Sequence, residues 1–217
     1  ATMRTGTLLS GEISHHFGFP FQVYPGDVIN AAFSPIEFTP IYGKGPLGAF
    51  GPSEAIPSFV RLGKTQVELG LRQLLGPRFG ASQSILGIDV GWAHVRDMPG
   101  DDDLRLSAPG VTGPRDFGHL PDADSWGYRL LAALTYEGVL GGLTVQPHAA
   151  WFQDVSGTTP GPGGSFVEGR KAFSVGVSVD YTNTWLLQLD YTNLYGAGRF
   201  NLLTDRDFVR FQLSYFY

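Results

Sequence analysis

The residues best suited to chemistry in this chain are nine charged side chains that recur at alternate positions of apolar–polar segments. They are Glu12, Glu68, Arg72, Asp89, Arg129, Glu137, Asp180, Asp190 and Arg210. A period of two places all of them on the polar face of extended segments. Six carboxylates against three arginines leave three negative charges, which would be costly in a dry interior. Two interpretations stay open: a hydrated path that mildly favours cations, or an Arg–carboxylate network that braces a narrow interior.

A hydrolytic site is a weaker interpretation of the same polar face. His148 shares that face with Ser174 and Ser178, and Asp180 could orient the histidine as in a nucleophile–base pair. No motif binds these residues together, so we predict no catalytic residue and no enzyme activity. The other histidines, His15, His16, His94 and His119, lack metal-ligand spacing. We therefore predict no metal site and no cofactor.

Eight segments must position these side chains, and their alternation predicts antiparallel β-strands. They span residues 7–16, 64–75, 84–94, 126–137, 143–152, 171–181, 185–193 and 207–217. The last of them has one wholly apolar face that ends on an aromatic residue, made of Val209, Phe211, Leu213, Tyr215 and Tyr217. Outside the strands, Pro25–Phe33 is expected to form a helical turn or two, with Asp27 as a possible N-cap.

Composition narrows the class of protein. Charged residues make up 16% of the 217 residues, against about 25% in soluble proteins, and aromatic residues reach 13%. The net charge of −5 argues against a nucleic-acid partner. No apolar run reaches the roughly 18 residues of a transmembrane helix, whereas a membrane strand needs only about 9–11. The chain lacks cysteine and opens without a signal peptide, so we expect either a mature protein or a piece of a longer one.

The connections between the predicted strands alternate in length. The long ones are residues 17–63, 95–125, 153–170 and 194–206, and the short ones are 76–83, 138–142 and 182–184. This asymmetry, with tryptophan and tyrosine near strand ends, is typical of an antiparallel barrel in a bacterial outer membrane. We predict one such domain over residues 1–217, with short periplasmic turns and residues 17–63 as a long Pro/Gly-rich external loop. A soluble β-sandwich is the alternative.

Two charged loop segments are further candidates. Asp101, Asp102 and Asp103 form either a solvated loop or ligands for a divalent cation at a lipopolysaccharide surface. A second group, at the mouth of the last hairpin, comprises Arg199, Asp205, Arg206 and Asp207. We interpret this group mainly as a charge-paired anchor for the loop, with contact to a solute as the alternative.

Several motifs carry a resemblance to a known family. They are Asp124-Ser125-Trp126-Gly127-Tyr128-Arg129, the block from Pro160 to Lys171, Asn183-Thr184-Trp185, Asp190-Tyr191-Thr192-Asn193 and the block from Asn201 to Val209. Together they resemble the C-terminal part of a large proteobacterial family of outer-membrane barrels of unknown function, often encoded beside exporters of the resistance–nodulation–division type. Members are considerably longer than this chain, so the resemblance implies a C-terminal portion or a shortened relative. The family offers no established catalytic residues.

These observations lead to one functional hypothesis and one alternative. The first is a channel or transport component for small or hydrophobic solutes, located in the bacterial outer membrane. The alternative is a structural or adhesion barrel that anchors its loops or an envelope complex. Expected partners are membrane lipid, lipopolysaccharide and, by the resemblance, exporter components. Because eight strands leave an interior just filled by side chains, we expect that they do not close and that the outermost strands pair with further strands.

Overall fold

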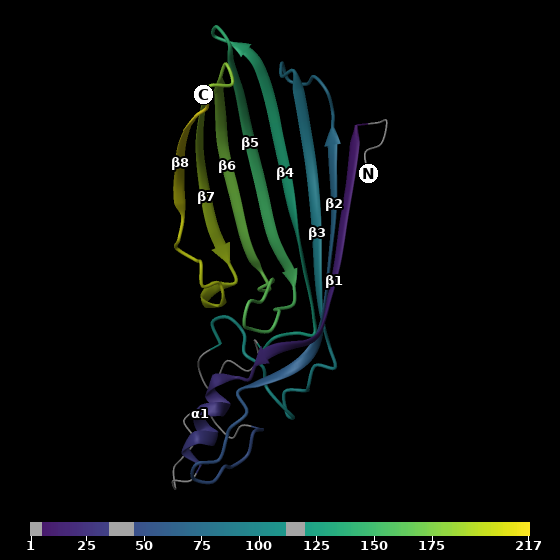
Figure 1. Ribbon diagram of the computed structural model, residues 1–217, viewed down its shortest axis with the longest axis vertical. Helices are drawn as coiled ribbons and strands as arrows, with labels where there is room; N and C mark the ends of the chain where they lie inside the picture. Colours follow the sequence, from purple (N-terminus) through teal and green to yellow (C-terminus); the bar gives the residue numbers. More distant parts are fainter. Residues whose placement is uncertain (1–5, 35–45, 112–119) are drawn as a thin grey trace.

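The computed structural model describes residues 6–34, 46–111 and 120–217. It contains one antiparallel sheet in which eight strands follow each other in chain order (Figure 1). The strands are β1 (Thr7–Gln22), β2 (Phe59–Leu74), β3 (Gln83–Arg96), β4 (Asp124–Val139), β5 (Leu143–Ser156), β6 (Arg170–Tyr181), β7 (Trp185–Gly196) and β8 (Phe208–Tyr215). Helix within the described residues is confined to α1 (Pro25–Phe33) and the short 3₁₀ turn η2 (Gly198–Phe200). The predicted all-β class, the eight strands and their antiparallel order are therefore confirmed.

The first two strands extend further than the sequence predicts. β1 continues through Gln22 and β2 begins at Phe59, so the connection predicted over residues 17–63 shrinks to 23–58. A register shift between His16 and Phe19 breaks the alternation there, which hides the extension from a period-two pattern. Pro20 fits because β1 is an edge strand, where a missing backbone N–H leaves no ladder bond unmade.

The strand register separates the two predicted faces of the sheet. Val177 lies opposite Leu189, and Leu189 lies opposite Phe211. On the other face Ser178 lies opposite Gln188, which lies opposite Gln212. Side chains of directly opposed residues share a face, so at these positions an apolar face and a polar face each run across neighbouring strands. We call them the outer face and the inner face.

The sheet is open. Each neighbouring pair from β1–β2 to β7–β8 is hydrogen-bonded, but β1 and β8, both fully described, do not pair with each other. The expectation that these eight strands do not close is confirmed. Each outermost strand consequently presents one edge of unpaired backbone N–H and C=O groups.

The two ends of the sheet differ in the length of their connections. Residues 75–82, 140–142 and 182–184 form short turns at the end where β1 begins and β8 finishes, at the top of Figure 1. Residues 23–58, 97–123, 157–169 and 197–207 connect the strands at the opposite end. The predicted alternation of short and long connections is thus present. No helix within the described ranges has both the length and the apolar character to cross a membrane.

The long connections pack into a folded unit with its own core, which we call the loop cap. It comprises residues 19–34, 95–111 and 157–169 together with the ends of β1 and β2 that reach into it (Figure 1). Phe21, Val95 and Leu106 form one buried apolar cluster. Three backbone hydrogen bonds join the end of β1 to two connections in a ring: Gln22 N–H to Gly161 O (3.0 Å), Gly161 N–H to Ser107 O (2.8 Å), and Ser107 N–H to Gln22 O (2.8 Å).

A buried ion pair ties α1 into the loop cap. Arg105 Nε donates to Asp27 Oδ2 at 2.8 Å, and the side chains of Asp27 and Arg105 are 0% and 8% exposed. The predicted helix over Pro25–Phe33 is confirmed, but its N-cap residue is Tyr24, with no side-chain cap bond. The prediction of Asp27 as N-cap is wrong because Pro25 begins the helix, which places the Asp27 carboxylate in the first turn, facing Arg105.

Replacement of Asp27 by alanine should loosen the loop cap. Arg105 would lose its buried carboxylate partner, and removal of one member of a buried ion pair costs about 3–5 kcal/mol. Amide hydrogen exchange over residues 20–34 and 100–107 should accelerate accordingly. The double variant Asp27→Leu/Arg105→Met should recover much of the protection because it removes both charges. Arg96→Ala, which breaks a pair whose side chains are 70% and 83% exposed, serves as control and should change exchange little. Equal exchange in Asp27→Ala and Arg96→Ala would contradict this role.

Candidate functional site

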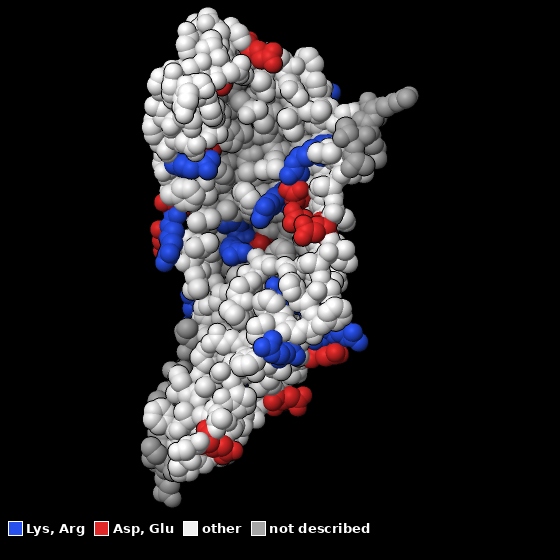
Figure 2. Space-filling model, viewed as in Figure 1, with Lys and Arg blue, Asp and Glu red and all other residues white. Residues whose placement is uncertain are grey.

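A hollow of about 740 Å³ lies on the inner face of the sheet. Strands β1 to β8 and the connections 157–169 and 197–207 all contribute residues to its lining. Figure 2 shows charged side chains of both signs gathered over the middle of the sheet, with further charged side chains on the lower part of the molecule. Of the residues predicted to line a lumen, Glu12, Glu68, Asp89 and Arg129 line this hollow.

The first charged contact on the inner face joins β2 to β3. Arg72 donates to both carboxylate oxygens of Asp89, at 2.9 and 2.8 Å. Two glycines give this pair its room, because a Cβ atom at Gly87 would lie 2.6 Å from Arg72 Cδ and one at Gly70 would lie 2.8 Å from Asp89 Oδ1. The pair therefore lies along the sheet instead of standing up from it. A two-pronged Arg–carboxylate contact fixes orientation as well as charge.

The second charged contact joins β5, β7 and β8 around the buried carboxylate of Asp190. His148 Nε2 lies 2.7 Å from Asp190 Oδ1, and Arg210 Nη2 donates to Asp190 Oδ2 at 2.7 Å. Only 8% of the Asp190 side chain is exposed. Gly176 of β6 lies beneath the group, and a Cβ atom there would come within 2.6 Å of His148 Nε2. The three side chains thus fill the space that the glycine leaves.

This contact changes the predicted role of the histidine. The sequence-based hypothesis paired His148 with Asp180, but the contacting carboxylate is Asp190. Asp180 instead accepts the backbone N–H of Asn183 in the β6–β7 turn at 2.9 Å. Ser174 hydrogen-bonds with Thr192 and Ser178 with Gln188. The residues of the considered hydrolytic site are therefore committed to other partners.

The remaining predicted lumen residues are not brought into these two contacts. Glu12 and Glu68 lie directly opposite each other on β1 and β2, both exposed to the hollow. Glu137 lies exposed near the short-turn end of β4. Arg129 lies opposite Asp89, yet its guanidinium lies over the Phe152 ring, 5.5 Å from the ring centre.

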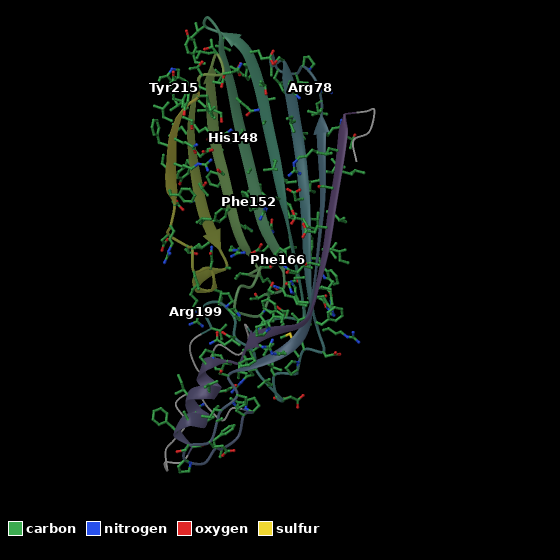
Figure 3. The ribbon with its side chains drawn as sticks, viewed as in Figure 1. Arg78, His148, Phe152, Phe166, Arg199 and Tyr215 are labelled. Atoms are coloured by element: carbon green, nitrogen blue, oxygen red, sulfur yellow. The ribbon has the colours of Figure 1, made fainter. Side chains whose placement is uncertain are left out.

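The connection 157–169 enters the hollow, which sequence reasoning missed. The Phe166 ring lies over Gly91 and Gly127, which are opposite each other on β3 and β4; a Cβ atom at either would lie 3.1 Å from the ring. Figure 3 shows the order along the sheet, with His148 nearest the short turns, then Phe152, then Phe166 nearest the long connections. Glycine on the polar face at two neighbouring positions was the available signal, since it marks a place where another group approaches the backbone.

Hydrogen bonds hold this connection in place. Ser165 Oγ accepts from Gln66 Nε2 at 3.1 Å, and Thr159 Oγ1 lies 2.8 Å from Ser125 Oγ in a buried contact. At its far end Asp154 accepts from the backbone N–H of Val167 at 2.9 Å and from Arg170 Nε at 2.7 Å. The motif from Pro160 to Lys171 is therefore a folded segment, beyond the simple loop that its glycines suggested.

The predicted loop-mouth residues lie in the connection 197–207. Asp207 accepts the backbone N–H of Leu194 at 3.0 Å, Asn193 Nδ2 at 2.6 Å and Tyr191 Oη at 3.0 Å. The Leu194 N–H is the main cause that lowers the pKa of the Asp207 carboxyl, and the Asn193 amide adds to it. Asp207 is thus an anchor held by hydrogen bonds. Arg199 lies over the Phe200 ring, and Asp205 and Arg206 are exposed.

Neither of the two charged loop segments forms a metal site in the part of the chain that the structure describes. Asp101, Asp102 and Asp103 are all exposed in a turn after β3. Within residues 6–34, 46–111 and 120–217, no three His, Asp or Glu side chains converge as metal ligands would. His119 lies outside the described residues.

Comparison with known proteins gives one match. A family described as "Protein of unknown function (DUF1302)" matches residues 1–216. No curated protein and no solved structure matches.

A methyl group at Gly176 should disturb the contact around Asp190. In Gly176→Ala the new Cβ would crowd His148 Nε2 and, at 2.8 Å, the Leu189 carbonyl oxygen, and overpacking of this kind costs about 1–3 kcal/mol. The denaturant midpoint of unfolding should fall. Gly18→Ala is the control, because the nearest atom to its Cβ is 4.0 Å away. Equal midpoints for the two variants would show that Gly176 is not needed for space.

Removal of the Asp207 carboxylate should free the last long connection. Asp207→Ala should accelerate amide exchange over residues 194–207, while the neighbouring Arg206→Ala should not. The carboxylate's lowered pKa sets the sign of the pH effect. Its contribution is complete above the ordinary aspartate pKa of about 3.9 and is lost as the pH falls through the lower folded value. Protection that disappears already near pH 5 would contradict this anchor.

Proposed function

The chain belongs to the DUF1302 family, a family of unknown function whose model matches residues 1–216, and we propose that it is an outer-membrane barrel protein that conducts or helps transport small or hydrophobic solutes. The observation that carries the proposal is the outer face. Large apolar side chains on it are exposed across the strands, among them Leu69, Leu86, Leu130, Val175, Leu189, Val209, Phe211 and Leu213. Soluble monomers rarely expose a continuous apolar patch of this kind.

Aromatic residues at both ends of the outer face support a membrane location. Trp92 and Trp126 lie opposite each other near the long connections. Trp185 packs against Tyr215 near the short turns, with ring centres 4.7 Å apart. Such rings prefer the two interfaces between lipid and water. The short turns would then be periplasmic and the loop cap external.

The open edges of β1 and β8 favour a wider barrel. Unpaired backbone N–H and C=O groups cost several kcal/mol each in lipid, so strands cross membranes only in closed sheets. We infer that in the membrane these two edges pair with further strands. A wider barrel also suits the inner face, whose polar side chains and 740 Å³ hollow are compatible with water.

The charges of the inner face modify the expected selectivity. Asp89 and Asp190 each have an arginine partner, so among the predicted inner carboxylates Glu12 and Glu68 are the ones that line the hollow without an arginine ion pair in the described residues. The Arg–carboxylate pairs then brace the same inner face that lines the hydrated path. The structural or adhesion alternative keeps one argument in its favour, because the loop cap has a buried core of its own.

A conductance experiment with introduced cysteines tests the channel. The natural chain has no cysteine, so Ser178→Cys on the inner face and Val177→Cys beside it on the outer face each give a single reactive site. We expect the protein, with the open edges of β1 and β8 paired to further strands, to form ion-conducting pores in planar bilayers. A charged, water-soluble methanethiosulfonate reagent should change the conductance of Ser178→Cys and leave that of Val177→Cys unchanged.

Two results would count against this proposal. Membrane insertion without conductance would favour the anchoring alternative. Equal modification of both cysteines in the membrane-inserted protein would mean that the outer face is not covered by lipid.

A further inference from the structure

One corner of the hollow is apolar although many of the residues that line the hollow are polar or charged. Phe152, Ala172 and Leu194 follow each other across β5, β6 and β7 at directly opposed positions. Phe166 from the connection 157–169 and Phe208 of β8 also line the hollow. We call these five residues the apolar corner. The next inner positions on β6 and β7 carry Ser174 and Thr192 instead, so the corner ends there.

Phe166 is a fixed part of this corner. Its ring is seated on Gly91 and Gly127. Its backbone N–H donates to Thr159 Oγ1 at 3.1 Å, and its carbonyl accepts the Thr159 N–H at 3.0 Å. A ligand therefore meets an apolar wall that is already in place, which lowers the ordering cost of binding.

Arg129 borders the apolar corner, and no hydrogen bond or ion pair joins it to a carboxylate within the described residues, although its charge acts on nearby Asp154. Arg129 lies opposite Phe152, and its guanidinium lies over that ring. The nearby carboxylate of Asp89 is engaged by Arg72 at 2.8 Å, and that of Asp154 by Arg170 at 2.7 Å. The planar guanidinium keeps its donors for a ligand, and its geometry suits a carboxylate in a two-pronged contact.

The charges on the opposite side of the hollow determine which end of a bound ligand lies at Arg129. Glu12 and Glu68 lie on β1 and β2, away from the apolar corner, and would repel an anionic group. A negative head group is therefore stabilised at Arg129 on β4 and destabilised at the β1–β2 wall. The rest of the ligand then extends over β5 to β7, where the wall is apolar.

We propose that the apolar corner and Arg129 bind a monocarboxylate that carries a hydrocarbon chain or ring. Arg129 pairs with the carboxylate, while Phe152 and Phe166 contact the hydrocarbon. A volume of about 740 Å³ lies within the usual range of small-molecule sites, roughly 300–1,000 Å³. The inference rests on the proposed transport function, for which it names the class of solute.

Binding of a fluorinated probe tests the site directly. The full chain in lipid nanodiscs is titrated with 4-(4-fluorophenyl)butanoate and, separately, with its uncharged primary amide, while ¹⁹F NMR follows binding and empty nanodiscs correct for partition into lipid. The acid should bind more tightly than the amide. Arg129→Gln should weaken acid binding at least about tenfold, the loss expected for one charge-assisted contact, and leave the amide unchanged. Phe166→Ala should weaken both probes.

Arg61→Gln is the matched control. Arg61 also lies over an aromatic ring, that of Phe59 at 5.6 Å, but outside the hollow, so this change should leave acid binding intact. Equal affinity for acid and amide, or unchanged acid binding in Arg129→Gln, would overturn the proposal. Conductance in potassium chloride is measured on the same preparations. If the protein conducts ions but binds acid and amide equally, the proposed binding site is refuted and the channel is not. If it binds the acid more tightly but does not conduct, the channel is refuted and the binding site stands.

Discussion

Close approach of side chains to the backbone at glycine is the constraint on which the inner face depends. Neighbouring strands are only about 4.8 Å apart, so long charged side chains on every inner position would crowd each other. Gly87 lies under Arg72, Gly176 under the His148–Asp190 contact, and Gly91 with Gly127 under Phe166. Each of these groups lies flat along the sheet because the position beneath it has no side chain. The hollow remains open for the same reason.

Because these side chains lie flat along the sheet, charged groups of different strands come close enough to neutralise each other. An isolated carboxylate as buried as Asp190 would be costly, but a histidine of β5 and an arginine of β8 share its two oxygens. The histidine reaches Asp190 across β6, so these contacts link β5, β7 and β8 and neutralise charge at the same time. Of the predicted charges that line the hollow outside these ion pairs, Glu12 and Glu68 lie on β1 and β2 and Arg129 lies on β4. The inner face therefore has a direction that its total charge does not reveal.

Sequence reasoning succeeded where the information is local and failed where it depends on distant neighbours. Period-two alternation found eight strands and both faces because a strand's side chains alternate regardless of tertiary structure. It lost β1 after His16, where a register shift breaks the period. It assigned Asp180 to His148 because the two share a parity, whereas the strand register places Asp190 beside the histidine. The prediction for Asp27 failed for the same reason. A local capping pattern cannot show that Asp27 contacts Arg105, which lies 78 positions further along the chain.

The block from Pro160 to Lys171 connects the loop cap to the wall of the hollow. Gly161 takes part in the backbone ring that closes the loop cap, and Phe166, five residues later, covers two glycines of the hollow. Between them Gly164 must stay small, because a Cβ atom there would lie 2.6 Å from the Thr159 carbonyl oxygen. After them Val167 and Arg170 both contact Asp154, which fixes the return into β6. A structural change in the loop cap is therefore transmitted to the wall of the hollow through this short, hydrogen-bonded segment. The sequence of the motif is constrained by its contacts with both the loop cap and the hollow.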